Sequence, residues 1–205
     1  MTPEAVEHLT RSDKIMARLI GKVGPCTLEI KSRSPFEALV TAVTHQQLNG
    51  TAANTILKRV VALFAVSRFP TPAALLAMPD EKLRAAGLSR AKIVAVKDIA
   101  AKTIEGVIPP ARAIVKMSEA EILERLMTVR GVGPWTIEML LIFTLGRTDV
   151  FPVTDYGVRK GFAMTYGWKE LPSPRELLEF GEKWRPHRST AAWYFWRALD
   201  TAVKA

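Results

Sequence analysis

The sequence is poor in the residues that build metal and redox sites. Cys26 is the only cysteine among 205 residues, which excludes an internal disulfide and a four-cysteine iron–sulfur cluster. The three histidines lie far apart and lack the spacing of zinc ligands. We therefore expect no zinc site, and we interpret Cys26 as a packing residue.

Long apolar runs are missing as well. No stretch of about 18 apolar residues occurs, which argues against a membrane-spanning helix and a membrane partner. The first residues include Glu4 and Glu7 and contain no apolar core of a signal sequence. We therefore expect a protein that is neither secreted nor bound to a membrane.

Alternating strand patterns are also absent, whereas helix signals recur along the chain. Ser or Thr before Pro marks several helix starts, and Gly or paired Pro marks several ends. The expected fold class is all-α, and the length suffices for one domain or two small lobes. We predict helices over approximately 5–21, 34–48, 50–64, 71–78, 79–86, 89–105, 118–129, 134–145, 155–166 and 188–203, with a further helix opening at residue 173.

What the composition does offer is positive charge. Lys and Arg number 29 against 20 Asp and Glu, for a net charge of +9. Many basic proteins do not bind nucleic acid, so the excess becomes informative only when a binding motif agrees with it.

The chain offers such a motif at residues 118–136. Ser118 and Glu121 have the spacing of a capping box that opens an apolar-periodic helix. Gly131 and Gly133 then interrupt the helix pattern, and Pro134 stands where the next helix should begin. That next helix is almost wholly apolar, which predicts its burial. Such a turn leaves backbone N–H groups at a helix N-terminus, a ready site for phosphate.

Residues 126–136 resemble the hairpin of the helix-hairpin-helix-GPD DNA glycosylase superfamily, in which a catalytic Asp follows the Gly-Val-Gly turn. Here Asp155 follows Trp135 by twenty residues, the spacing of that family. The resemblance is closest to the 3-methyladenine DNA glycosylase II branch, which carries Trp and Asp-Tyr where Trp135, Asp155 and Tyr156 stand. That branch also has a C-terminal run like residues 184–189, which leads to a Trp. The resemblance covers nearly the whole chain, from about residue 5 to residue 196.

The resemblance implies a two-lobed helical DNA glycosylase fold with a DNA cleft between the lobes. One lobe, a helical barrel that includes the hairpin, would span residues 33–147, and the other would combine residues 1–32 and 148–205. The implied activity is that of a DNA-3-methyladenine glycosylase II in base excision repair. We expect a monomer that binds double-stranded DNA with damaged bases, in the cytoplasm of a bacterium or the nucleus of a eukaryote.

Asp155 carries the chemistry under this resemblance. The local sequence alone favours a plainer interpretation, a helix N-cap, because an Asp here directly precedes a helical pattern. The two interpretations are compatible, since a helix N-terminus favours an ionised carboxylate. A negative charge near the sugar stabilises the oxocarbenium character that develops as the base departs, and the same group can orient the attacking water.

Trp135 determines the expected reaction subclass. Bifunctional relatives carry a Lys at this position and form a Schiff base with the sugar, which leads to strand cleavage. An indole cannot form a Schiff base. We therefore expect a monofunctional glycosylase that leaves an intact abasic site and has no lyase activity.

Four residues are expected to line a base pocket, namely Trp135, Met139, Tyr156 and Trp196. Trp196 matches the C-terminal Trp of the family's pocket, although aromatic residues on a last helix are more often core. An electron-rich ring suits N3- or N7-alkylated purines, because a positive charge over indole gains roughly 0.5–2 kcal/mol. Met139 departs from one branch member, which has Tyr there, so the lesion range stays open.

Residues 46–49 end the helix that opens at Ser34. A polar helix end is the plainer interpretation, but the family uses a residue here as a wedge that fills the gap left by a flipped nucleotide. We expect Gln47 to be this wedge, with Leu48 and Asn49 beside it in the minor groove. The spacing does not separate the three firmly.

Contacts with DNA phosphate are expected at two helix starts. Gly131 and Gly133 would present backbone N–H groups, with Thr136 beside them. Ser89 and Lys92 would contribute at the helix that begins near them, although a solvated, capped helix end explains this pair equally well.

The family also suggests one structural ion. By positional analogy, the backbone carbonyls of Met127, Val129 and Gly131 would hold a monovalent cation. We expect no other cofactor.

Three other functions stay open. The same fold could excise deaminated or oxidised bases, a helix-hairpin-helix module could bind DNA without catalysis, or a helical adaptor could bind proteins. A pure phosphate binder needs neither Asp155 nor the aromatic residues. An adaptor does not explain the Gly-Val-Gly turn together with the positive charge.

Overall fold

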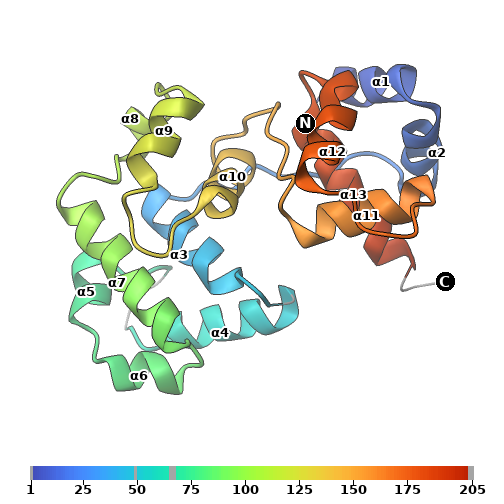
Figure 1. The fold of residues 1–205 in the computed structure, drawn as a ribbon. Coiled ribbons are helices and arrows are strands. Elements are labelled where there is room, and N and C mark those ends of the chain that lie inside the picture. Colours follow the sequence, from blue (N-terminus) through green and yellow to red (C-terminus); the bar gives the residue numbers. More distant parts are fainter. Residues whose placement is uncertain (1, 49, 65–67, 203–205) are drawn as a thin grey trace. The chain divides into compact units, whose positions relative to one another are not determined.

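The chain folds into helices joined by turns. The computed structural model describes residues 2–48, 50–64 and 68–202, and within these ranges it contains no β-strand (Figure 1). The expected all-α class is therefore confirmed. No helix in the described ranges combines the length and the apolar character that a bilayer crossing requires. The helices are α1 (Pro3–Ser12), α2 (Lys14–Val23), α3 (Pro35–His45), α4 (Gly50–Ala62), α5 (Pro72–Ala77), α6 (Asp80–Ala85), α7 (Arg90–Ile104), α8 (Ala111–Ile114), α9 (Glu119–Leu126), α10 (Pro134–Phe143), α11 (Tyr156–Tyr166), α12 (Pro174–Phe180), the 3-10 helix η1 (Gly181–Trp184) and α13 (Arg188–Ala202).

The helices form two compact units. The terminal unit combines both ends of the chain, Met1–Ile30 and Leu145–Ala205. The middle unit is the continuous segment Lys31–Thr144. The hairpin and the predicted wedge belong to the middle unit, whereas Asp155 belongs to the terminal unit.

In the terminal unit, α11 and α13 approach each other closely. A Cβ added at Gly161 would lie 2.1 Å from the carbonyl oxygen of Phe195, so only glycine fits there. Beside this contact, Phe162 stacks on Tyr166 with 4.5 Å between the ring centroids. Trp184 is fully buried and meets the Phe195 ring at 5.4 Å. These rings form the core against which α11 packs, and α11 begins directly after Asp155.

The N-terminal segment differs from the prediction of a single opening helix. Two helices, α1 and α2, meet at Asp13, whose Oδ1 accepts hydrogen bonds from the N–H groups of Ile15 at 2.8 Å and Met16 at 3.0 Å. Asp13 Oδ2 accepts further bonds of 2.6 Å from the Tyr166 hydroxyl and from Lys183 Nζ. Apolar residues continue at helical spacing across Asp13, so the sequence predicted one continuous helix. In the structure Asp13 ends α1 and caps the start of α2.

The same contacts shift the acidity of this carboxyl. Burial alone would raise the pKa of Asp13. The hydrogen bonds from Lys183, Tyr166 and Met16 outweigh the burial, so the pKa of Asp13 lies below its ordinary value.

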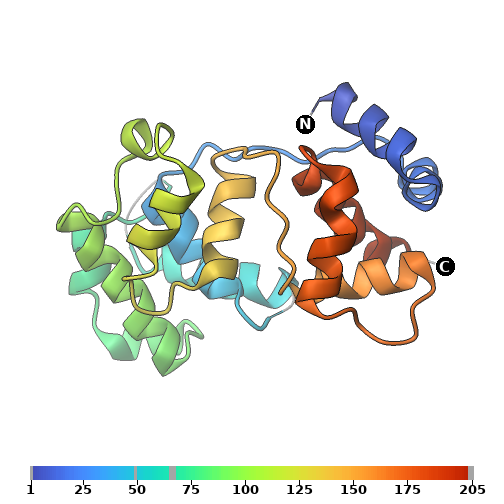
Figure 2. The ribbon, with the colours of Figure 1, turned by 45° about the horizontal axis from the view of Figure 1, so that its top comes forward.

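In the middle unit, α3 lies between α7 and α10 (Figure 2). The side chains of Leu39, Val96 and Ile137, one from each of these helices, are fully buried. Burial of α10 was expected from its apolar sequence, and most of its apolar side chains are indeed buried. The arrangement places the end of α3 beside the start of α10.

Helix starts agree with the sequence better than helix ends. The predicted N-caps are confirmed where a side chain accepts an N–H of the first turn, at Ser34, Thr71, Ser89, Ser118 and Ser173. The helices expected to reach residues 48 and 129 end earlier, at His45 and Leu126. Short turns replace their last residues, as in the bonds from the Leu48 N–H to the His45 carbonyl and from the Val129 N–H to the Leu126 carbonyl.

Candidate functional site

The hairpin between α9 and α10 has the predicted construction. The Ser118 hydroxyl accepts the Glu121 N–H, and the Glu121 carboxylate accepts the Ser118 N–H, so the capping box is confirmed. Pro134 is the first residue of α10. Gly131 has a φ of 76°, and a Cβ added there would lie 2.4 Å from the Ala95 side chain. The turn therefore requires glycine at this position.

An acidic side chain of α7 holds the turn in place. Asp98 Oδ2 accepts a hydrogen bond of 2.7 Å from the Arg130 N–H. The two residues are 32 positions apart in the chain. No local pattern reveals such a pair, which explains why the sequence did not single out Asp98.

The hairpin residues predicted to contact phosphate fall into two groups. Gly131 is exposed, and Gly133 is the N-cap of α10 without a capping side chain. Thr136 differs, because its side chain is only 1% exposed and its hydroxyl accepts a 2.9 Å bond from Gln46 Nε2. The Thr136 hydroxyl is therefore not available to DNA. A contact by Thr136 stays a prediction for its backbone N–H, which lies in the first turn of α10.

Ser89 and Lys92 are placed at the start of α7. Ser89 caps this helix, because its hydroxyl accepts the Lys92 N–H at 3.2 Å. Lys92 Nζ donates to the carbonyl oxygens of Thr44 at 2.8 Å and Gln46 at 2.9 Å. Burial lowers the pKa of this ammonium group. An ammonium has three donors, so a contact with phosphate stays a prediction for the remaining one.

The predicted wedge follows the end of α3. Gln47 is exposed and has a φ of 56°, a left-handed backbone conformation that residues other than Gly rarely adopt. Such a conformation costs on the order of 1–3 kcal/mol and persists only where the surroundings enforce it, often at functional sites. Leu48 is 40% exposed. Asn49, the third residue predicted here, lies outside the described residues.

Gln46, for which the sequence predicts no role, links this loop to the hairpin. Its Nε2 donates to the Gly131 carbonyl at 3.0 Å and to the Thr136 hydroxyl at 2.9 Å. A single Gln at a polar helix end carries no signal in the sequence. Its partners follow it by about 85 residues or more in the sequence, so only folding brings them within hydrogen-bond distance.

Asp155 is the N-cap of α11, as its local sequence predicts. Its Oδ1 accepts hydrogen bonds from the Val158 N–H at 2.7 Å and from Trp196 Nε1 at 2.8 Å. A Cβ added at Gly157 would lie 2.8 Å from the Trp196 ring and 3.0 Å from Asp155 Oδ1. The carboxylate is thus held in one orientation from two sides. Its catalytic role stays a prediction.

The C-terminal run 184–189 fixes the segment that leads to Asp155. Arg188 donates to both carboxylate oxygens of Asp149, from Nε at 2.7 Å and from Nη2 at 3.1 Å. The fully buried Ser189 hydroxyl accepts the Val150 N–H at 3.0 Å and lies 2.8 Å from the Arg147 carbonyl oxygen. Residues 188 and 189 therefore hold residues 147–150, the segment that precedes Asp155. Sequence reasoning missed Asp149 because its partners lie about 40 residues away.

The aromatic residues of the last helix differ in their burial. Trp193, Tyr194 and Phe195 are buried, whereas Trp196 is half-buried and contacts Asp155. The hydrogen bond from the Trp196 indole is an additional role that the sequence did not indicate.

The other predicted pocket residues lie on different units. Tyr156, directly after Asp155, is 66% exposed. Trp135 and Met139 are half-buried on α10, in the middle unit, whereas Tyr156 and Trp196 belong to the terminal unit. Because these residues belong to different units, their shared role in base binding stays a prediction.

The carbonyls predicted to hold a monovalent cation are partly engaged. The Gly131 carbonyl accepts from Gln46, and the Val129 carbonyl accepts the Val132 N–H at 3.1 Å. A carbonyl oxygen has a second lone pair, and oxygen donors suit a hard cation. The donor set at Met127, Val129 and Gly131 therefore fits such an ion, whose presence stays a prediction.

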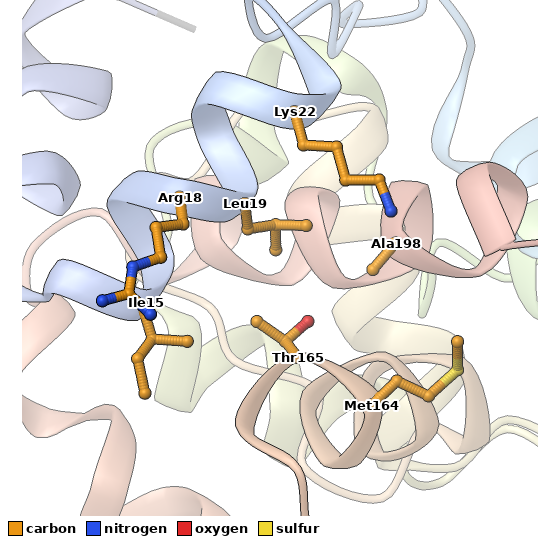
Figure 3. A pocket seen from close by; sticks show the side chains of 7 residues that line it. All are labelled: Ile15, Arg18, Leu19, Lys22, Met164, Thr165 and Ala198. Carbon is orange, nitrogen blue, oxygen red and sulfur yellow. The ribbon is translucent and has the colours of Figure 1, made fainter.

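A shallow pocket of the terminal unit lies away from Asp155. Met164 and Thr165, near the end of α11, form one wall, whereas Asp155 caps the start of the same helix. The pocket is therefore not the predicted base pocket. Its lining comes from α2, α11 and α13, and consists of Ile15, Arg18, Leu19, Lys22, Met164, Thr165 and Ala198 (Figure 3).

Hairpin, capped Asp and C-terminal run together define a class of DNA repair protein. Residues 40–187 match the family model of the HhH-GPD superfamily base excision DNA repair proteins. The chain belongs to this family.

Several relatives are similar over nearly the whole chain. DNA-3-methyladenine glycosylase 1 of Schizosaccharomyces pombe is 38% identical over 198 residues, which is 95% of this chain and 86% of the relative. Alkylbase DNA glycosidase-like protein mag2 of the same organism is 34% identical, over 94% of this chain and 92% of the relative. The solved structure of the S. pombe 3-methyladenine DNA glycosylase Mag1 in complex with abasic DNA has a TM-score of 0.91 and 38% identity, covering 94% of this chain and 95% of that one.

Proposed function

We propose that this protein is a DNA glycosylase that hydrolyses the N-glycosidic bond of alkylated purines, of the 3-methyladenine type, in base excision repair. The observation that carries the proposal is the Asp155 carboxylate, held at the start of α11 by Val158 and Trp196. Membership of a base excision repair family supports the same reaction. So do relatives whose names refer to 3-methyladenine or alkylated bases.

The reaction begins with extrusion of the damaged nucleotide, which costs a few kcal/mol of stacking and pairing. Gln47 and Leu48, exposed after the end of α3, fill the space that the nucleotide leaves in the duplex. The N–H groups of Gly131 and Gly133 hold the phosphate backbone at the start of α10. Extrusion brings the sugar within reach of Asp155.

Bond cleavage then proceeds with little acid catalysis. Alkylation at N3 or N7 makes the purine cationic, so it departs as a neutral base when it takes the electron pair of the C1′–N9 bond. Asp155 stabilises the positive charge that develops on the sugar. Water adds to C1′ and loses a proton, for which the Asp155 carboxylate serves as base.

Several finer features belong to the same proposal. Trp135 supplies no amine, so the enzyme leaves the abasic strand intact. The glycosylase II type is proposed from the resemblance to that branch. It acts as a monomer on damaged double-stranded DNA. The carbonyl oxygens of Met127, Val129 and Gly131 would hold a monovalent cation, which would stabilise the turn.

The test is to incubate the protein with duplexes that carry 3-methyladenine, 7-methylguanine, hypoxanthine or 1-methyladenine, and to identify the released bases by mass spectrometry. We expect release of 3-methyladenine and 7-methylguanine, the purines alkylated at N3 and N7. Release of hypoxanthine alone would assign a different lesion class. DNA binding that weakens with salt, without release of any base, would indicate a binding module instead.

A further inference from the structure

The loop that carries the predicted wedge is tied to two other elements of the middle unit. Lys92 Nζ, from α7, donates to the carbonyl oxygens of Thr44 and Gln46 at 2.8 and 2.9 Å. The Gln46 side chain in turn donates to the Gly131 carbonyl at 3.0 Å and the Thr136 hydroxyl at 2.9 Å. Gln46, the residue before the wedge, is therefore bound at two points. Its carbonyl oxygen is bonded to α7, and its side chain is bonded to the hairpin and the start of α10.

The Lys92 contact lies at the C-terminal end of α3. The last carbonyls of a helix lack partners within the helix and carry the negative end of its dipole. The ammonium of Lys92 satisfies two such carbonyls at the end of α3. One of them belongs to the peptide group that joins Gln46 to Gln47, the residue in the left-handed conformation. Lys92 thus restrains the backbone directly before the wedge.

We propose that Lys92 and Gln46 are positioning residues for base extrusion. They hold Gln47 and Leu48 at a fixed distance from the hairpin, so that insertion of the wedge and contact with phosphate occur as one event. The inference rests on the proposed function. Because both residues belong to the middle unit and Asp155 belongs to the terminal unit, their loss should impair extrusion and leave the bond-cleavage step itself unaffected.

The test follows insertion of the wedge beside an abasic site, a step of extrusion that involves no chemistry. A duplex carries an abasic-site analogue with 2-aminopurine beside it, whose fluorescence rises when a wedge unstacks the neighbouring base. We expect Lys92→Met to slow this rise by roughly tenfold, because a charge-assisted hydrogen bond is lost. Lys92→Arg should restore part of the rate, since it retains a charged donor. Gln46→Leu, which keeps the Lys92 bonds to the Thr44 and Gln46 carbonyls, should also slow the rise.

A matched control lies on the same helix. Lys102 forms an exposed ion pair with Glu105 at 2.6 Å, so Lys102→Met should leave the fluorescence rise unchanged. Far-ultraviolet circular dichroism confirms that each variant is folded.

The outcomes separate the two proposals. A wild-type rate in folded Lys92→Met and Gln46→Leu would overturn the positioning role, as would the absence of any rise with the wild-type protein. Excision of 3-methyladenine is measured in parallel. A normal wild-type rise without excision would contradict the glycosylase function and still support the positioning role when the variants are slow.

Discussion

The Asp155 carboxylate accepts two hydrogen bonds on one oxygen. It caps α11 through the Val158 N–H, and it is held toward one orientation by the Trp196 indole. The cap could be predicted from the sequence because capping is local. The indole contact could not, because it spans 41 residues and depends on how α11 packs against α13.

Removing the indole donor tests this orientation. Trp196→Phe keeps an aromatic ring but loses the hydrogen bond to Asp155, and hydrogen bonds to charged groups contribute about 1.5–3 kcal/mol. We expect the single-turnover rate of excision to fall by roughly tenfold or more, with little change in affinity for abasic DNA. Trp168→Phe is the matched control, because Trp168 is 39% exposed in the same unit. Equal rates for the two variants would show that the contact does not matter.

Trp135 allows a test of the reaction subclass. The indole cannot form a Schiff base with the abasic sugar. Borohydride added during turnover should therefore trap no covalent protein–DNA adduct, as judged by denaturing gel electrophoresis. The abasic strand should stay uncut until alkali is added. A trapped adduct would show that another amine of this chain has lyase activity.

At the scale of the helices, the sequence predicts where helices begin better than it predicts which helices contact one another. Each Ser or Thr cap depends on residues three positions away, so Ser34 or Ser118 could be recognised from the printed sequence. Asp13 was missed because the apolar spacing of α1 and α2 continues across it. The close approach of α11 to α13 was not predictable, because nothing in the sequence distinguishes Gly161 from the other eleven glycines.

Gly161 tests the close approach of these two helices. In Gly161→Ala, the new Cβ would overlap the Phe195 carbonyl oxygen, which is backbone and cannot rotate away. We expect a loss of about 1–3 kcal/mol in the free energy of unfolding, measured by urea denaturation. Gly21→Ala is the control, because nothing lies within 4 Å of its added Cβ. It should be neutral or stabilise the protein by up to roughly 1 kcal/mol. Equal stability of the two variants would contradict the close contact.

The break between α1 and α2 predicts a dependence of stability on pH. The pKa of Asp13 is lower in the folded chain than its ordinary value of 3.8, so the ionised carboxylate stabilises the fold above that pH. Asp13→Asn keeps a capping side chain but loses the ion pair with Lys183. We expect the wild type to exceed this variant by about 1–3 kcal/mol at pH 7. The difference should shrink as the pH falls through the lowered pKa, and a difference that is constant down to pH 2 would contradict the assignment.

At the scale of the whole molecule, the residues with predicted roles are divided between two units of one chain. The middle unit carries the hairpin, the wedge loop and the Lys92 and Gln46 contacts. The terminal unit carries Asp155, Trp196 and the ion pair of Arg188 with Asp149. The sequence revealed the hairpin and the Asp because both have local spacing. It did not reveal the contacts that support them, because those pairs meet only after folding.

This division leads to the most direct test of the central claim, that Asp155 cleaves the glycosidic bond of a nucleotide held by other residues. Asp155→Asn retains a capping side chain and the hairpin, so the variant should fold and bind damaged duplex DNA with nearly wild-type affinity. We predict that its single-turnover release of 3-methyladenine falls by at least about 100-fold, because the charge that stabilises the sugar is gone. Release at the wild-type rate would contradict the account.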